Sequence, residues 1–423
     1  MKFVLILSLI FICLQSTNAQ TIITRDPEDI WAIQWSPDAS KLAVGYYNGH
    51  FQVFDTSDMS LIFEDASLNI PVRWFGWSPS GTRLAVGYLE QAINIWDIVN
   101  SVKELSIPVG KHGSGSLTWS DDENYLFVGG DVDMPTLRKY DMSNGNLVHS
   151  FWNGVIVDLV FIDDENQAVA LDYDFIIFVN PDDLTREFFP IDNPLQPAPL
   201  GRATTISLHP SQEFIAIGHA NYQVTIWDLQ TRQITTTLDA GTPFNDIYGV
   251  TDLAFNATGT RLFAVTYEGT IHSWDTSTWQ LIEQTDIDGL ILNADFSPDA
   301  RQIAYGDLEQ DSQIFIRDLC DFVASDGANL ENILPQANNF NEEAQICLIE
   351  NGQYDLTAPL PTITGDITII GNGVRITMIG EGQIFTVGES GKLTLKDVTL
   401  SGGDGMQGNV IDGVTVYEAN SSR

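Results

Sequence analysis

The chain has 423 residues, of which 43% are hydrophobic, so it is long enough to form two or three domains with sizeable cores. Its 57 acidic and 19 basic residues give a formal net charge of −38, which repels phosphate backbones and anionic membrane surfaces. This balance excludes nucleic acid as an expected partner and leaves solubility, or recruitment of basic partners, as the role of the charge.

The N-terminus has the features of a secretory signal. Lys2 precedes an apolar run at residues 3–13, and Thr17-Asn18-Ala19 supplies a small-x-small cleavage site. The run is too short to span a bilayer, and Ile12 before Cys13 does not fit a lipoprotein signal. We therefore expect residues 1–19 to be removed and the protein to be secreted or held at the cell surface, with no transmembrane segment.

A repeated pattern of strands organises residues 20–319, and it is clearest at residues 72–97. An acidic or amide residue closes a strand in each copy, at Asp55, Asp97, Asp141, Asn180, Asp228, Asp275 and Asp318. A Trp-Ser-Pro turn or a variant of it, as at Trp35-Ser36-Pro37, separates two strands in most copies. Seven units fit, each with three strong strand signals and a weaker fourth.

These units resemble the WD-repeat family, because Trp96-Asp97, Trp227-Asp228 and Trp274-Asp275 carry its name-giving dipeptide. The resemblance implies an all-β, seven-bladed β-propeller that serves as a platform for protein or peptide partners. The family's Gly-His before the first strand is missing from every copy. We therefore expect no Trp–Ser–His–Asp hydrogen-bond network, and blades that hold together mainly by apolar packing.

The ring needs a closing strand, since an open sheet edge invites unwanted pairing. Residues 21–24 lie just before the first full repeat and are predicted to form the outer strand of the seventh blade. The alternative closing segment is residues 319–323.

Composition changes in residues 320–423, which are predicted to form a second domain. Leu330, Ile333 and Leu334 indicate a short amphipathic helix that starts at Ser325 or Asp326. Short apolar strands with glycine turns follow, as at Gly371-Asn372-Gly373. This segment is similar to the opening of right-handed parallel β-helices of the pectin-lyase type, in which an N-terminal helix covers the first coil. Self-association through these coils is a further possibility.

Two cysteines remain after signal removal, Cys320 and Cys347, and an exported chain with an even pair predicts a disulfide. The alternative is two buried thiols.

The sequence offers little catalytic chemistry. None of the six histidines forms a closely spaced metal-type pair, and no nucleophile elbow or phosphate-binding loop is present. Coil turns explain Asp397 and Asp412 better than catalysis does. We therefore predict no enzymatic activity, no metal and no cofactor.

What remains is a binding surface near one rim of the propeller. Tyr, Trp and Arg are the usual anchors of interfaces. The candidate partner-binding residues are Trp31, Tyr46, Arg73, Trp74, Tyr88, Arg202, His219, Tyr248 and Tyr267. The predicted function is an exported, non-catalytic scaffold. The alternatives are a glycan-active or glycan-binding protein that uses the β-helix segment, and a structural surface protein.

Overall fold

The computed structural model describes residues 19–23, 29–89, 92–109, 116–130, 137–151, 155–162, 167–191, 201–241, 249–287, 289–307, 313–340, 344–348, 352–402, 408–409 and 415–418. The chain divides into two units, Ala19–Arg317 and Asp318–Arg423. Of the predicted signal segment, only Ala19 lies within the described residues. No helix in the described ranges is long and apolar enough to cross a membrane.

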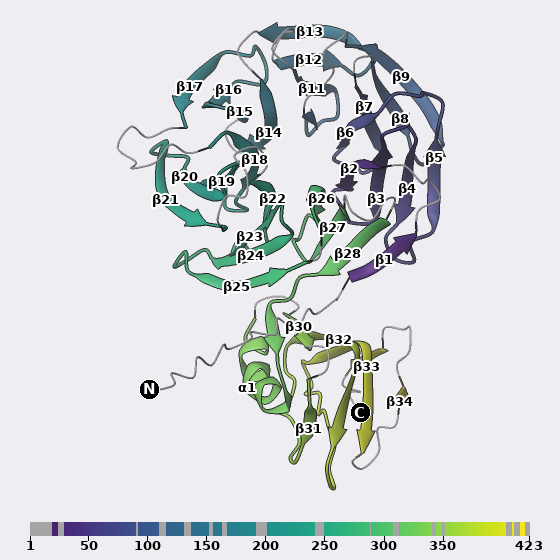
Figure 1. The fold of residues 1–423 in the computed structure, drawn as a ribbon, viewed down its shortest axis with the longest axis vertical. Coiled ribbons are helices and arrows are strands. Elements are labelled where there is room, and N and C mark those ends of the chain that lie inside the picture. Colours follow the sequence, from purple (N-terminus) through teal and green to yellow (C-terminus); the bar gives the residue numbers. More distant parts are fainter. Residues whose placement is uncertain are drawn as a thin grey trace, which may run out of the picture. The chain divides into compact units, whose positions relative to one another are not determined.

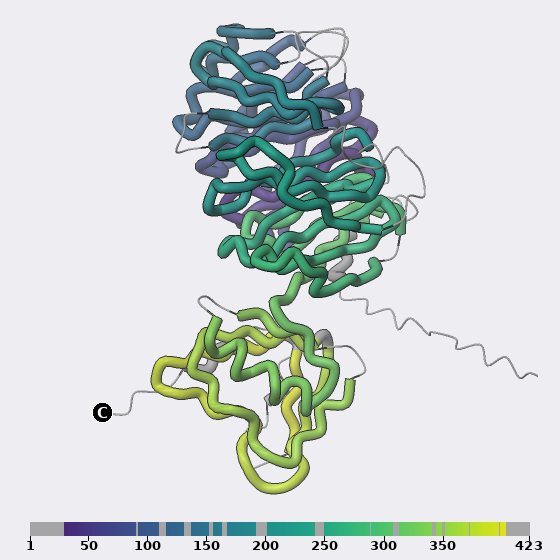
Figure 2. Tube along the Cα trace, turned by 90° about the vertical axis from the view of Figure 1, so that its left-hand side faces the viewer, coloured from purple at the N-terminus to yellow at the C-terminus, as the bar shows by residue number. Residues whose placement is uncertain are grey.

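The first unit is a ring of seven four-stranded antiparallel sheets, as the repeat count predicted (Figure 1). Figure 2 shows the same ring from its side. Blades 1 to 3 are β2 (Ile30–Trp35), β3 (Lys41–Tyr46), β4 (Phe51–Asp55), β5 (Leu61–Asp65); β6 (Val72–Trp77), β7 (Arg83–Tyr88), β8 (Ala92–Asp97), β9 (Val102–Pro108); β10 (Leu117–Trp119), β11 (Tyr125–Gly129), β12 (Leu137–Asp141) and β13 (Asn146–Phe151).

The remaining blades repeat this arrangement, and the first strand of each blade faces the centre of the ring (Figure 1). Blades 4 to 7 are β14 (Ile156–Ile162), β15 (Gln167–Asp172), β16 (Phe175–Val179), β17 (Arg186–Pro190); β18 (Ala203–Leu208), β19 (Phe214–His219), β20 (Gln223–Asp228), β21 (Gln233–Asp239); β22 (Val250–Phe255), β23 (Arg261–Thr266), β24 (Thr270–Asp275), β25 (Leu281–Asp286); β26 (Ile291–Phe296), β27 (Gln302–Asp307) and β28 (Gln313–Asp318).

The N-terminal segment closes the ring. Strand β1 (Ala19–Ile23) pairs antiparallel with β28, from Ala19 opposite Arg317 to Ile23 opposite Gln313. It is the outer strand of blade 7, so the predicted closure is confirmed. The alternative is wrong, because β29 (Phe322–Ala324) pairs with β30 (Ala344–Leu348) in the second unit.

The strand-ending acids of the repeat act as turn caps. The Asp275 carboxylate accepts hydrogen bonds from the backbone N–H groups of Ser277 and Thr278 and from both of their hydroxyls. Asp55, Asp97, Asp141 and Asp228 accept equivalent bonds in their own blades. A short polar side chain that fixes the turn between the third and fourth strands explains why the position recurs.

Adjacent blades pack through apolar side chains, as expected. Phe51 and Val53 of blade 1, for example, share one buried cluster with Phe75, Trp77 and Trp96 of blade 2. In blade 5 a shorter polar chain is present, which lacks the Ser and the Asp of the network that the sequence predicts to be absent. The His219 ring contacts the Thr225 hydroxyl at 2.8 Å, and Trp227 Nε1 donates to that hydroxyl at 3.3 Å.

The second unit is a mostly parallel sheet. It contains β29, helix α1 (Gly327–Ala337), β30, β31 (Tyr354–Leu356), β32 (Asp366–Met378), β33 (Lys392–Gly402), β34 (Gly408–Asn409) and β35 (Thr415–Glu418). Strand β29 pairs in parallel with β30, β30 with β32, and β32 with β33. Strand β31 also pairs in parallel with β32. Strands β34 and β35 pair antiparallel with β33.

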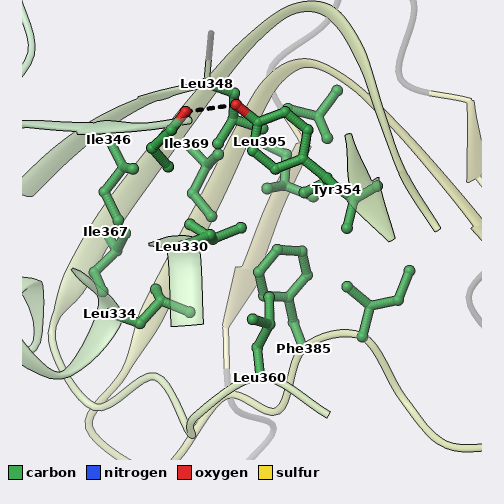
Figure 3. Packing of buried hydrophobic residues seen from close by; sticks show 14 of the residues in the cluster. Leu330, Leu334, Ile346, Leu348, Tyr354, Leu360, Ile367, Ile369, Phe385 and Leu395 are labelled. Carbon is green, nitrogen blue, oxygen red and sulfur yellow. Dashed lines mark hydrogen bonds between the residues drawn. The ribbon is translucent and has the colours of Figure 1, made fainter. Parts of the chain in front are cut away.

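The predicted helix covers the apolar core of this unit. Helix α1 begins after the N-cap Asp326, whose side chain accepts from the Asn329 N–H. Its Leu330 and Leu334 belong to the buried cluster that also contains Ile346 and Leu395 (Figure 3). The dashed line in that view is the bond from the Tyr354 hydroxyl to the Ala324 carbonyl, at 2.5 Å.

The two cysteines are paired. Cys320 and Cys347 are joined in the structure, with Cα atoms 5.7 Å apart, a separation typical of disulfides. The bond links the segment before β29 to β30, so it fastens the entry of the chain into the second unit.

Candidate functional site: the central cavity of the propeller

The inner strands of six blades carry a β-bulge near their start. The register shifts at Trp31, Arg73, Val157, Thr204, Thr251 and Leu292, each of which is an extra residue without a direct partner on the next strand. A bulge re-aims its side chain. All six residues, together with the residue that follows each of them, line one cavity of about 720 Å³ among the inner strands. The bulges therefore build the wall of this central cavity.

The aromatic and basic residues of the wall gather on blades 1 and 2. The Arg73 guanidinium lies 5.0 Å from the centre of the Trp31 ring and 5.2 Å from that of Trp74. Tyr47 packs edge-on against Trp31 with ring centres 4.7 Å apart. Such stacking holds a guanidinium in place over two indole faces. We call Trp31, Tyr47, Arg73 and Trp74 the Trp–Arg cluster.

Three carboxyl groups stand on the inner strands of blades 4, 6 and 7. Burial raises the pKa of Asp158 to about 6. Burial, with the negative charge of Asp158 added, raises the pKa of Asp252 to about 7. The pKa of Asp295 is also raised well above its usual value, by burial and by the charge of Asp252. These three acids therefore differ from the strand-ending acids. Hydrogen bonds from Ser57 lower the pKa of Asp55, for example.

The structure brings together three of the predicted partner-binding residues, Trp31, Arg73 and Trp74. Tyr46, Tyr88 and His219, by contrast, are 0% exposed and cannot present a contact surface, so their assignment as surface contacts is corrected. Each ends the second strand of its blade and pairs with the first residue of an inner strand, which places its side chain in the packed interior.

Of the other three predicted residues, Tyr267 and Arg202 are described by the structure and are not part of the cluster. Thr266, not Tyr267, occupies the register position of Tyr46, opposite Val250. Arg202 is exposed and stacks on Tyr173, 5.0 Å from its ring centre, outside the cavity lining. Tyr248 lies outside the described residues.

Sequence reasoning missed Tyr47 and the three acids with raised pKa. Tyr47 is 49% exposed, and it directly follows Tyr46, which is buried. A signal for Asp158 and Asp252 was present, since each stands inside an inner strand and before a buried leucine. Across the described ranges, no group of three or more histidine, cysteine or acidic side chains is arranged to hold a metal ion.

Comparisons with known proteins agree with the fold. The family model described as WD domain, G-beta repeat matches residues 18–55 and 243–275. The solved structure of U3-55K is similar, with a TM-score of 0.60 and 13% identity, over 72% of this chain and 99% of that chain. No curated protein matches. As many as 1880 solved chains match, so the fold alone does not specify a function. Residues Ala19–Arg317 form a seven-bladed β-propeller, and the WD-repeat model matches two parts of it.

Proposed function

We propose that the protein is a non-catalytic scaffold that docks a protein or peptide partner on the propeller face carrying the Trp–Arg cluster. WD-repeat propellers typically serve as interaction scaffolds, and the family match supports the same role here. The observation that carries the proposal is the Arg73 guanidinium stacked between Trp31 and Trp74 beside the central cavity.

The composition of the cluster favours docking. Trp, Tyr and Arg are the residues that contribute most to the binding energy of interfaces, because they offer large contact areas with few rotatable bonds. Arg73 and Tyr47 are exposed, while Trp31 and Trp74 are half-buried. The two indoles are therefore supported by the protein, and Arg73 and Tyr47 are accessible to a partner. The side chains on which a partner would rest are thus already ordered.

The test is capture of partners from the native surroundings by the purified protein and by a Trp31→Ala, Arg73→Ala double variant. A partner retained by the wild type and lost by the variant, then reproduced with the purified partner, supports the proposal. The matched control is Leu281→Ala, which removes another half-exposed apolar side chain on the outer strand β25. A partner that binds all three proteins equally would place docking elsewhere.

Export is part of the same proposal. The apolar run at residues 3–13 and the Cys320–Cys347 pair both favour an oxidising compartment outside the cytoplasm. Expression of the full chain in a secreting host should give a product that begins at Gln20. Under non-reducing conditions its mass should be lower than that of the reduced chain by two hydrogen atoms, because the two thiols are oxidised to a disulfide. An intact N-terminus with two free thiols would contradict export.

We also infer that the second unit is the start of a parallel β-helix. The parallel pairing of β29, β30, β32 and β33 supports this, as does the position of α1 against the apolar core. Self-association by stacking coils is less favoured, because β35 already pairs with β33 over Lys392–Leu395. A sedimentation measurement that finds a monomer at high concentration would agree with this.

A further inference from the structure

We propose that the partner presents a proline-rich segment, in the polyproline II conformation, to the Trp–Arg cluster. This inference rests on the proposed function and deepens it, because it names the chemistry of the segment that docks. Three features of the cluster carry it: the hydrogen-bonding groups of its side chains, the spacing of its planar groups and the charge around it.

The two indoles of the cluster differ from the indoles that join the blades. Three indoles donate from Nε1 to a backbone carbonyl of a neighbouring blade, those of Trp35, Trp77 and Trp119. Within the part of the chain that the structure describes, neither Trp31 nor Trp74 makes such a bond, and the Tyr47 hydroxyl makes none either. All three side chains are at least partly exposed. Their donor groups are therefore open to a ligand.

This set of groups favours a ligand that is rich in hydrogen-bond acceptors. An indole and a guanidinium have donors only, and the phenol of Tyr47 can act in either sense. An ordinary peptide brings one N–H and one C=O for each residue, so its N–H groups would find few acceptors on the cluster. Proline brings a C=O alone, and a polyproline II helix makes no internal hydrogen bonds, so its carbonyls accept from outside. A proline-rich segment therefore complements the donors of the cluster.

The planar groups of the cluster contact one another in series. The ring centres of Tyr47 and Trp31 are 4.7 Å apart, and the Arg73 guanidinium lies 5.0 Å from the centre of Trp31 and 5.2 Å from that of Trp74. A polyproline II helix rises about 3.1 Å per residue, so three spacings of about 5 Å match up to about five residues. Aromatic-lined grooves bind this helix well because it is already stiff and loses little conformational entropy on binding.

The charges around the cluster favour a neutral segment. The net charge of −38 repels an acidic segment, and Arg73 repels a basic one at the point of contact. A segment composed mainly of proline meets neither repulsion. A basic segment drawn to Asp158 and Asp252, which line the same cavity, is the alternative that the experiment must separate.

The test is a magnetic resonance titration of the full chain, with isotope-labelled indole nitrogens, by a blocked oligoproline peptide. Oligoproline should bind in one saturable step and shift the Nε1–H signals of Trp31 and Trp74, assigned from the Trp31→Phe and Trp74→Phe variants. The signals of Trp77 and Trp119 should stay in place, because their N–H groups are already bonded between blades.

Peptides of equal length provide the comparison, with glycine and serine, lysine, or glutamate in place of proline. All three should bind more weakly than oligoproline. Equal binding of the glycine–serine peptide would overturn the proposal, because it would show that neither the missing N–H groups nor the preformed helix matters. Stronger binding of the lysine or the glutamate peptide would overturn it too, in favour of a charged partner.

A matched pair of variants tests the hydrogen bond itself. Trp31→Phe keeps an aromatic ring but removes the N–H, and it should weaken oligoproline binding about fivefold, the loss expected for one hydrogen bond. Trp279→Phe removes another half-buried indole, between β24 and β25, and should leave the affinity unchanged. Equal effects of the two changes would overturn the proposal.

Capture of partners separates this inference from the proposed function. If a partner is lost by the Trp31→Ala, Arg73→Ala variant but oligoproline does not bind the wild type, docking on the cluster stands and the polyproline chemistry is wrong. If the captured partner no longer binds once the prolines of its docking segment are replaced by alanine, the chemistry is supported. A partner that the double variant retains, together with no binding of oligoproline, would overturn both.

Discussion

Residues 39 and 81 occupy the same place in the turn after the inner strand, but one is Ala and the other Gly. Both have positive φ, 57° at Ala39 and 65° at Gly81, a region that costs a residue with a Cβ about 1 kcal/mol. A Cβ added at Gly81 would meet no atom nearer than 3.6 Å, so packing does not oppose that substitution, whereas the Ala39 methyl packs against the core of blade 1 and its loss offsets part of the gain. Ala39→Gly should therefore stabilise the propeller by up to about 1 kcal/mol and Gly81→Ala should destabilise it by about as much, measured by urea unfolding. Two destabilising changes would show that this backbone conformation does not decide the cost.

A second prediction concerns the buried indoles. Trp119 Nε1 donates to the Gly76 carbonyl of the next blade at 2.8 Å, whereas Trp96 Nε1 is buried without a hydrogen-bond partner in the described part of the chain. Trp119→Phe removes a hydrogen bond between blades and should cost about 1 kcal/mol more than Trp96→Phe, which removes an unsatisfied donor. Both changes remove similar volume, so the difference between their unfolding free energies reports the bond. Equal costs would mean that the Trp119 bond contributes nothing.

At the scale of elements, the repeat made much of the fold predictable. The strand-ending acids set the blade count, and the position of residues 21–24 before the first repeat indicated the closing strand. Helix α1 followed from Leu330, Ile333 and Leu334. The candidate site was less predictable, because the register shift before Trp74 and the burial of Tyr88 depend on pairing with other strands. Hydrophobic alternation shows that a strand exists but not where a bulge turns a side chain toward the cavity.

The closing strand should be essential to the ring. A chain that begins at residue 24 loses β1 and leaves β28 as an open edge. The loss should be several kcal/mol, at about 1 kcal/mol for each backbone hydrogen bond removed, and it should lower the thermal midpoint and promote aggregation. Removal of residues 1–18 alone is the control, since it keeps β1. An unchanged melting curve for the shorter chain would contradict the closure.

At the scale of the whole molecule, the acidic residues fall into two groups with opposite pKa shifts. Despite partial burial, hydrogen bonds from Ser36 and Ser40 hold the pKa of Asp38 at about 2, and the strand-ending acids are lowered in the same way. Asp158 and Asp252 are raised instead. A net charge of −38 was evident from composition, but this division was not, because it depends on which carboxyls accept hydrogen bonds at the surface and which lie in the central cavity.

The two groups predict a maximum of stability at mildly acid pH. The lowered carboxyls stabilise the fold above their unfolded value of 3.8, and that contribution is lost as pH falls toward 2. The raised carboxyls act in the opposite sense, and their contribution is lost as pH rises through about 6 and about 7. Urea unfolding across this range should therefore give the highest free energy near about pH 4, with a decline toward neutrality that the surplus of negative charge reinforces. Added salt should reduce the part of the decline that comes from exposed charges, because it screens them, and should leave the part that comes from the central cavity. Stability that rises steadily up to neutral pH would show that the cavity acids are ionised without cost.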